Sequence, residues 1–268
     1  MLPSNLFVLL SAAVLTSASP IYHLRKRCNE TLPDAPSPPP TSPPITATPV
    51  LPVNGGDTEL AGPGNATLKH IVVGHGIQNY TCASAGATAT SAGALAVFWD
   101  IQALYPGTGA SSLTEADWAA LPAKVLRTTD VPLNLLPTSS SQYAADPTAP
   151  FPSPATDLEI EGIDGPLRFM GHHFFDTTLT PTFDVQGDGT PAPFFQGKKD
   201  ADIKAPADAD KGLTDSGAVD WLRLTDKGTS SGPVSLVFRV LTAGGNPAPC
   251  TEAGQTDSVP YAAMYWMY

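Results

Sequence analysis

The 268-residue sequence is poor in charged side chains and poorest in basic ones. Charged residues make up 15% of the chain, and 14 Lys and Arg stand against 25 Asp and Glu, which leaves a formal net charge of −11. Nucleic acids and anionic membranes repel a chain of this charge at long range. The composition therefore predicts neither nucleic acid nor a membrane surface as a partner.

Cysteine is also scarce, with only Cys28, Cys82 and Cys250 in the chain. In an oxidising compartment one disulfide is expected from three cysteines. We favour a pair of Cys82 with Cys250, because both lie at the ends of segments that read as strands, whereas Cys28 precedes a proline-rich tract. Cys28 is then left without an assigned partner.

Long hydrophobic runs are absent apart from residues 6–15. A membrane span needs about 20 apolar residues, whereas this run has the length of a signal-peptide core. Small residues favour cleavage after Ala18, which predicts a signal peptide over residues 1–18. Residues 19–27 end in Arg25-Lys26-Arg27, which is either a processing site that would make them a propeptide or a solvated charge cluster. The chain is predicted to be secreted and to act outside the cell or in the cell wall.

Three Asn-x-Thr sequences are consistent with this compartment, at Asn29, Asn65 and Asn79. Such tripeptides accept N-linked glycans in secreted proteins. We expect these sites to be used at least in part.

Proline is abundant, with 29 residues in the chain and nine of them between Pro33 and Pro52. Proline lacks a backbone N–H, so this stretch cannot form a regular helix or sheet. Residues 28–67 are therefore predicted to be a disordered stalk rich in Pro, Ser and Thr, and the folded domain is predicted to span residues 68–268.

Apolar residues in this domain recur mostly with a period of two, which indicates strands. The candidate strands are residues 69–73, 78–83, 94–101, 158–161, 167–175, 182–185, 194–203, 219–225, 234–242 and 261–268. One helix is predicted over residues 114–121, with Thr114 as its cap and Pro122 as its end. Many strands with one short helix predict an all-β domain, either an antiparallel sandwich or a closed barrel.

Two short motifs match catalytic or cofactor patterns without the required context. Gly74-His75-Gly76 resembles the start of a dinucleotide fingerprint, but Asn79 stands where the third glycine belongs and the chain continues as a strand. A β-turn with two glycines is the preferred interpretation. Residues 228–232 match Gly-x-Ser-x-Gly, but a strand follows instead of the helix that a nucleophile elbow needs, so a polar hairpin loop is expected.

His172 and His173 stand out among only five histidines. Adjacent residues of a strand point to opposite faces, so the two rings are not expected to share a metal. One histidine could face an interior shared with Asp184 or Glu161, although a structural histidine held by hydrogen bonds is the preferred alternative. The candidate pocket comprises His173, Asp184, Glu161 and Trp221; no catalytic residue, metal or cofactor is assigned.

Aromatic residues on strands give a second lead, because flat rings that reach the surface can stack on sugars. The alternative is that they fill the core of the domain, which a β domain of about 200 residues needs. The residues concerned are Tyr80, Trp99, Trp221, Phe238, Tyr261, Tyr265 and Trp266.

Five ordered motifs carry a family resemblance: residues 74–82, 171–175, 218–222, 238–245 with 249–250, and 259–263. They resemble domain of unknown function 3455, a secreted family of fungi and bacteria, over residues 68–268. The resemblance implies a β-rich fold with shared cysteines at Cys82 and Cys250, and it supplies no catalytic residues. Members are often labelled malate dehydrogenase, an activity that the missing fingerprint helix and βαβ pattern argue against.

The leading functional hypothesis is a secreted glycoprotein with a non-enzymatic domain that binds a cell-wall glycan or an extracellular protein. The alternative is an extracellular hydrolase or carbohydrate-active enzyme that uses Glu159, Glu161 or Asp184 with a neighbouring histidine.

Overall fold

The computed structural model describes residues 47–185 and 194–268. The expected signal peptide, the candidate propeptide, Cys28 and Asn29 lie outside the described residues. No helix in the described part of the chain is long and apolar enough to cross a membrane.

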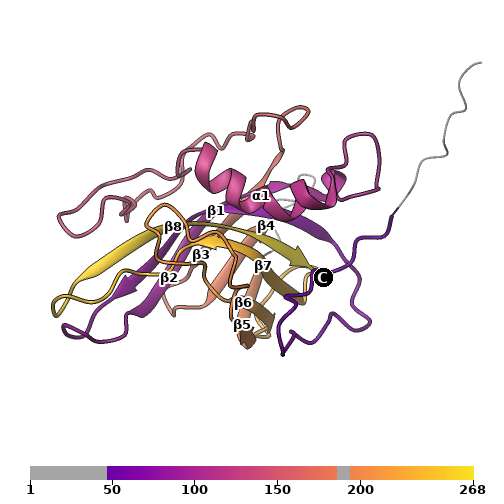
Figure 1. Cartoon of the computed structure of the whole chain (residues 1–268). Helices are drawn as coiled ribbons and strands as arrows, with labels where there is room; N and C mark the ends of the chain where they lie inside the picture. The colour runs from indigo at the N-terminus through magenta and orange to yellow at the C-terminus, as the bar shows by residue number, and fades with distance from the viewer. Residues whose placement is uncertain (1–46, 186–193) are drawn as a thin grey trace, which may run out of the picture. The chain divides into compact units, whose positions relative to one another are not determined.

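The described residues form an all-β fold with one α-helix, labelled in Figure 1. The strands are β1 (His70–Thr81), β2 (Thr90–Asp100), β3 (Phe169–Phe175), β4 (Pro181–Val185), β5 (Phe194–Ile203), β6 (Trp221–Asp226), β7 (Leu236–Gly244) and β8 (Thr256–Met267). The helix α1 (Glu115–Thr128) and the one-turn 3-10 helix η1 (Gln102–Leu104) lie between β2 and β3 in the sequence.

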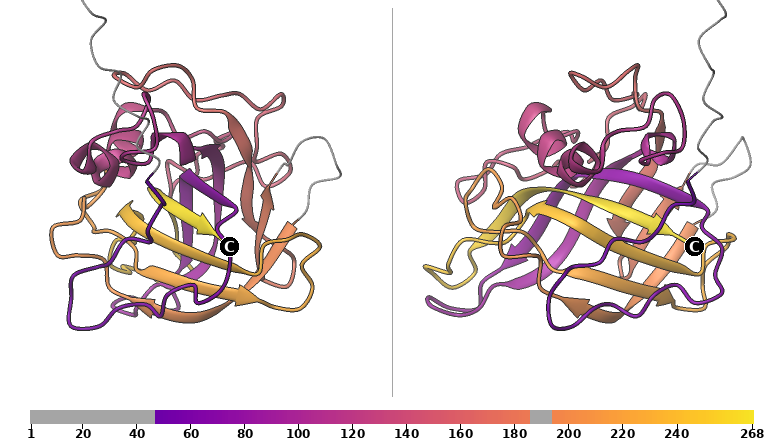
Figure 2. Two further views of the ribbon diagram at one scale, coloured as in Figure 1. Left: turned by 90° about the vertical axis from the view of Figure 1, so that its right-hand side faces the viewer. Right: turned by 45° about the vertical axis from the view of Figure 1, so that its right-hand side comes forward.

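The strands form a closed antiparallel barrel in which each strand pairs with the next and β8 pairs with β1. This result confirms the predicted all-β class and selects the barrel over the sandwich. The two views in Figure 2 show the strands wrapping around one interior, with α1 on the outer side. The segment predicted at residues 158–161 forms only one bridge, between Leu158 and Leu167.

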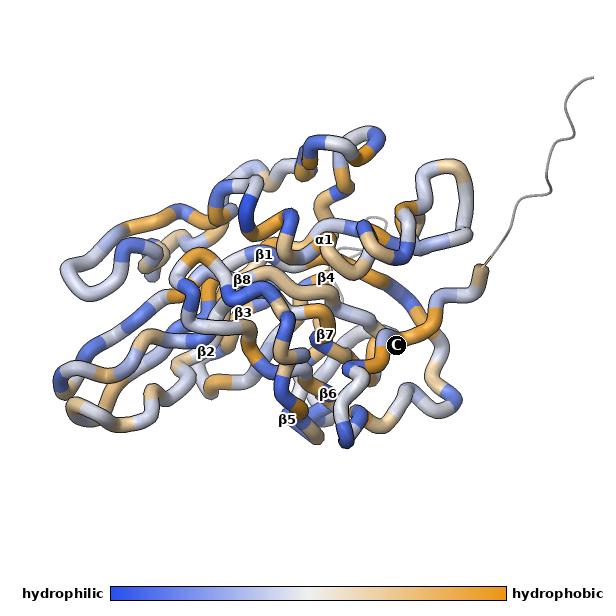
Figure 3. Tube along the Cα trace, in the orientation of Figure 1, coloured by the Kyte–Doolittle hydropathy of each residue, from blue (hydrophilic) through white to orange (hydrophobic). Residues whose placement is uncertain are grey.

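Closure gives each strand an inner and an outer face, and both faces of β8 are buried. Tyr261 and Tyr265 belong to the inner core, whereas Met264 and Trp266 belong to an outer core beneath α1. Helix α1 packs on β7, β8 and β1, and Figure 3 shows hydrophobic and hydrophilic residues interspersed along the chain. The continuous apolar sequence of β8 follows from this double burial.

The predicted β-turn at Gly74-His75-Gly76 is wrong, because these residues lie inside the continuous strand β1. A Cβ atom on Gly74 would lie 2.7 Å from the ring of Phe98, and one on Gly76 would lie 1.9 Å from the carbonyl oxygen of Leu95. Glycine at these positions thus lets the Phe98 ring and the neighbouring strand approach the backbone closely, which is a common role of glycine within a strand.

The predicted end of the helix at Pro122 is also wrong, because α1 continues to Thr128. The predicted cap is confirmed, with the Asp117 N–H donating to Thr114 Oγ1 at 3.1 Å. Pro122 removes one hydrogen-bond donor from the helix. The turns beyond it bury Val125 and Leu126 against the barrel, and tertiary packing supplies most of the stability of such a helix.

The chain before β1 differs from the expectation of a stalk that reaches residue 67. The Val50 N–H donates to the Tyr105 hydroxyl at 3.1 Å, and Asn54 Nδ2 donates to the Lys204 carbonyl at 2.7 Å. Leu51 and Leu60 pack against the outer core. Residues 47–67 therefore lie along the barrel, because their scattered leucines bury apolar surface that a purely polar stalk would lack.

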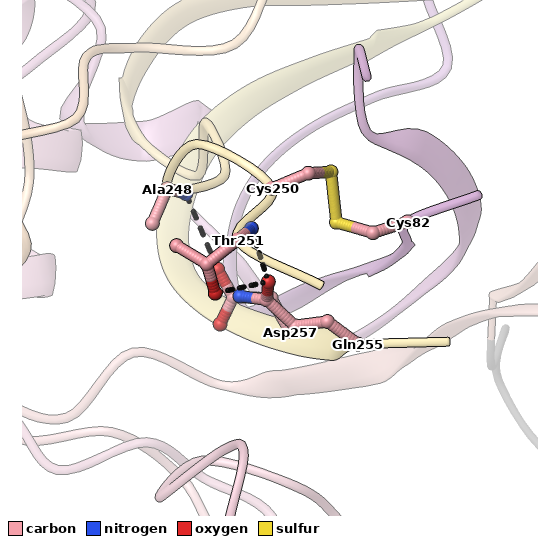
Figure 4. Close-up of a disulfide and its surroundings, with 6 residues drawn as sticks. All are labelled: Cys82, Ala248, Cys250, Thr251, Gln255 and Asp257. Atoms are coloured by element: carbon pink, nitrogen blue, oxygen red, sulfur yellow. Dashed lines mark hydrogen bonds between the residues drawn. A yellow bond between two sulfur atoms is a disulfide. The ribbon is translucent and has the colours of Figure 1, made fainter. Parts of the chain in front are cut away.

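The predicted disulfide between Cys82 and Cys250 is present, with Cα atoms 5.6 Å apart (Figure 4). It joins the β1–β2 loop to the β7–β8 loop. Backbone hydrogen bonds reinforce the junction, from the Gly86 N–H to the Cys250 carbonyl and from the Gly254 N–H to the Cys82 carbonyl, both 2.8 Å. The two loops thus form one stapled unit at one end of the barrel.

We predict that the double substitution Cys82→Ser with Cys250→Ser lowers the free energy of unfolding by about 2 to 5 kcal/mol, because the bridge closes a long loop in the unfolded chain. Urea unfolding followed by tryptophan fluorescence measures the loss. Cys28→Ser is the matched control and should unfold at the urea concentration of the parent. Equal midpoints for the parent and the double variant would contradict the stabilising role.

Candidate functional site

The barrel contains a cavity of about 750 Å³ to which all eight strands contribute lining residues. A barrel of eight strands is wide enough either to be filled by side chains or to hold one small ligand. Thr88 and Ala89 of one stapled loop and Asn246 and Pro247 of the other also line it. The cavity therefore lies next to the end of the barrel that the disulfide braces.

One wall of the cavity is a cluster of rings from β3, β4 and β8. His173 stacks on Phe183 with ring centroids 4.2 Å apart, and Tyr265 lies 5.7 Å from Phe183 and 6.0 Å from His173. Phe175 lies 5.6 Å from His173. Phe183 and Tyr265 are fully buried within this cluster, and the half-buried Phe175 is the ring that it exposes most to the cavity.

The cavity is basic although the chain is acidic. Five of the 14 basic residues line it against two of the 25 acidic residues. The basic residues are Lys198, Lys199, Lys204, Lys227 and Arg239, and the acidic ones are Asp202 and Asp220. Both aspartates pair with rim lysines, at 2.9 Å for Lys199 with Asp202 and 3.0 Å for Lys204 with Asp220. The lining thus carries a formal charge of 5 − 2 = +3.

Arg239 is the one deeply buried cation of this lining, with 8% of the residue exposed. Its Nε and Nη2 donate to the Asp220 carbonyl oxygen at 3.2 and 2.9 Å. Within the described residues no carboxylate forms a salt bridge with Arg239. A buried charge without a counter-ion is costly unless water or a ligand compensates it.

The phenols and the imidazole near Arg239 are neutral at pH 7. Burial raises the pKa of Tyr265 and raises the pKa of Tyr261 well above its usual value, while the Arg239 charge opposes both shifts. Burial lowers the pKa of His173 to about 4. His173 Nδ1 lies 2.9 Å from the Thr182 carbonyl, which can only accept, so the proton of the neutral ring is on Nδ1.

The structure does not bring the four candidate pocket residues together. His173 lines the cavity, but Asp184 is opposite His172 in the β3–β4 register, and Phe151 packs on the His172 ring outside the barrel. Glu161 is exposed in the loop before β3. Trp221 lies in the outer core with residues of α1. His172 and His173 do point to opposite faces, as strand geometry predicts.

The structure also shows where the candidate aromatic residues and the Gly-x-Ser-x-Gly motif lie. The seven aromatic residues on strands are all less than 10% exposed, so none is an exposed surface ring, and Tyr80 and Tyr265 also line the cavity. Residues 228–232 lie between the antiparallel strands β6 and β7, as the predicted hairpin loop requires. Across residues 47–185 and 194–268, no three His, Cys, Asp or Glu side chains are grouped closely enough to hold a metal ion.

Fold and cavity together define a closed eight-stranded antiparallel barrel with a basic, ring-lined interior. The family described as Protein of unknown function (DUF3455) matches residues 63–268. The chain belongs to this family. Searches of curated proteins and of solved structures give no match.

The sequence analysis did not select Arg239, the most informative residue of the cavity. A signal was present, because Arg239 is a single cation within the apolar strand sequence of residues 236–241. An arginine in such a strand is unusual in a core unless it is paired or functional. Its inward direction follows only from the barrel, in which Val237 faces the inner core while Phe238 and Val240 face the outer core.

A second buried histidine lies on the outer face of β1, beneath the C-terminal end of α1. Thr129 Oγ1 donates to the Val125 carbonyl at 2.8 Å, so it accepts from His75 Nδ1 at 3.1 Å. Burial lowers the pKa of His75 to about 4. His75 and His173 thus both fold in the neutral form.

We predict that stability falls on the acid side between pH 6.5 and about 4. Each histidine binds a proton near pH 6.5 in the unfolded chain but only near pH 4 in the folded one. Its contribution to the free energy of unfolding is therefore fully present above pH 6.5, and up to about 3 kcal/mol per histidine is lost as the pH falls to about 4. Urea unfolding at a series of pH values measures this slope. The single variants His75→Gln and His173→Gln should each remove a large part of it, and His172, whose pKa is also lowered by burial, contributes to the remainder.

Asp146, Asp176, Asp210 and Asp226 have pKa values lowered mainly by hydrogen bonds, so their stabilisation is present above the unfolded pKa of about 4 and is lost mainly below it, at the acid end of this range and beyond. An unfolding free energy that stays constant from pH 7 to pH 4.5 would contradict the neutral burial of the two histidines.

Proposed function

We propose that this chain is a secreted binding protein whose barrel holds one small organic molecule, and that it acts by binding and not by catalysis. The observation that carries the proposal is the cavity of about 750 Å³ inside a closed barrel. Ligand sites in proteins are concave, mostly apolar and about 300 to 1,000 Å³ in volume, with a few convergent polar groups. The ring wall and the polar groups around Arg239 match this description.

The distribution of carboxylates supports binding over hydrolysis. Hydrolysis of glycosides needs two carboxyl groups that face one substrate. Asp202 and Asp220 both pair with lysines, while Glu161 and Asp184 lie outside the cavity. A cell-wall glycan was expected as a partner because aromatic rings at the surface can stack on sugars, but the seven rings are buried. A glycan partner and an extracellular protein partner therefore stay predictions.

To test ligand binding, we propose a titration of the full chain with N-phenyl-1-naphthylamine, a neutral dye whose fluorescence rises in apolar surroundings. We expect saturable enhancement with one site per chain. Leu222→Trp should weaken binding at least tenfold, because Leu222 lines the cavity and a larger ring there occupies it. Leu213→Trp is the matched control, since Leu213 is exposed outside the cavity.

The proposal fails if the dye shows no saturable binding. It also fails if Leu222→Trp binds the dye as tightly as the parent, because the dye would then bind another surface. A fold check by far-UV circular dichroism on each variant separates loss of the site from loss of the barrel.

The secretory part of the proposal rests on the signal-peptide pattern, the glycosylation sequences and the disulfide, which is typical of oxidising compartments. Asn65 is exposed in the segment before β1. Asn79 is half-buried within β1, and its Oδ1 accepts from Ser258 Oγ at 2.7 Å. Asn65 is therefore the better glycan acceptor of the two.

Expression of the full chain in a fungal host should release a protein that begins at Ser19 or Cys28, as intact-mass analysis would show. Deglycosylation should lower its mass. Asn65→Gln should remove one glycan, whereas Asn79→Gln should leave the glycan mass unchanged. A product that begins at Met1 and remains inside the cell would overturn the secretory assignment.

A further inference from the structure

We infer that the ligand of this barrel is an aromatic carboxylate, which places its carboxylate at Arg239 and its ring against Phe175 and His173. The inference deepens the proposed function and rests on it. It concerns the chemical class of the ligand, which the cavity volume alone does not set.

The first argument is the unpaired charge. Arg239 faces inward from β7, where its register partners are Leu222 on β6 and Tyr265 on β8. Its guanidinium is held in place by the Asp220 carbonyl, while the Asp220 carboxylate pairs with Lys204. A planar guanidinium fixed in this way matches the geometry of a carboxylate, which it can bind with two parallel hydrogen bonds.

The second argument is an unused donor in the same lining. Gln78 lines the cavity from β1 and is 6% exposed, and the Tyr261 hydroxyl is within reach of only one of the two donor hydrogens on its Nε2, so the other has no partner among the described residues. It lies beside Tyr261, whose hydroxyl is 2.8 Å from that of Tyr265. A buried donor without a partner is costly, and a ligand oxygen would satisfy it.

The third argument concerns selectivity for one anionic group on an apolar body. The ring wall of β3, β4 and β8 offers stacking for a flat ligand, and the lining contains one buried cation. Lys227 is engaged with Thr180 Oγ1 at 2.6 Å, and Lys199 and Lys204 are bound to aspartates at the rim. Rim lysines raise the local concentration of anions, whereas Arg239 selects the group that is bound.

The test compares 2-naphthoate with 2-naphthamide, which have the same ring and similar size but differ in that the amide is neutral and has an NH2 in place of one carboxylate oxygen, by calorimetric titration of the full chain at pH 7. We expect the parent to bind 2-naphthoate at least tenfold more tightly than 2-naphthamide. Arg239→Met should abolish this preference while 2-naphthamide binds within threefold of its affinity for the parent. Arg168→Met is the matched control, since Arg168 is exposed outside the cavity, and should keep the full preference.

Arg239→Lys covers the case in which Arg239→Met fails to fold. Lysine keeps the charge but loses the planar fork, so the preference should shrink and not vanish. Equal affinity of the parent for both ligands, or a preference that persists in Arg239→Met, overturns the inference while dye binding still supports the proposed function. Absence of binding by both ligands also overturns it, and if the neutral dye does not bind either, the proposed function itself fails.

Discussion

The pairing of the last strand with the first is the constraint on which the structure depends. Along their full length β1 and β8 pair in register, from His70 opposite Met267 to Thr81 opposite Thr256. Antiparallel edges left open would expose unpaired backbone groups, and closure removes them. Closure also separates an inner face from an outer face on every strand. The outer face of β1, β7 and β8 is covered by α1, which leaves the inner face to enclose the cavity (Figure 1).

The inner face combines features that a purely structural core avoids. A barrel filled for stability would carry apolar side chains in well-defined rotamers. This one instead encloses open volume, a buried cation at Arg239 and an unsatisfied amide at Gln78. Each of these lowers the stability of the empty protein. Features that are unfavourable for folding and converge on one cavity are typical of binding sites, where the ligand supplies the missing partners.

The sequence predicted the strands well because strand signals are local. Nine of the ten candidate segments correspond to strands or to part of β1, and Thr114 signalled the start of α1 correctly. The failures came from long-range packing. Pro122 ended the predicted helix because the contacts of Val125 and Leu126 with the barrel were unknown, and Gly74 looked like a turn because the Phe98 ring that requires it is distant in sequence.

The site was less predictable than the fold for the same reason. His173, Asp184, Glu161 and Trp221 were grouped by residue type, but barrel register assigns them to different surfaces. The central claim is that the cavity receives an anion at Arg239. A crystal structure of the protein soaked with 2-naphthoate tests it most directly. The account predicts a carboxylate about 2.8 Å from the Arg239 guanidinium, with the ring against Phe175. Naphthoate bound only outside the barrel, or inside it with the carboxylate directed away from Arg239, would contradict the account.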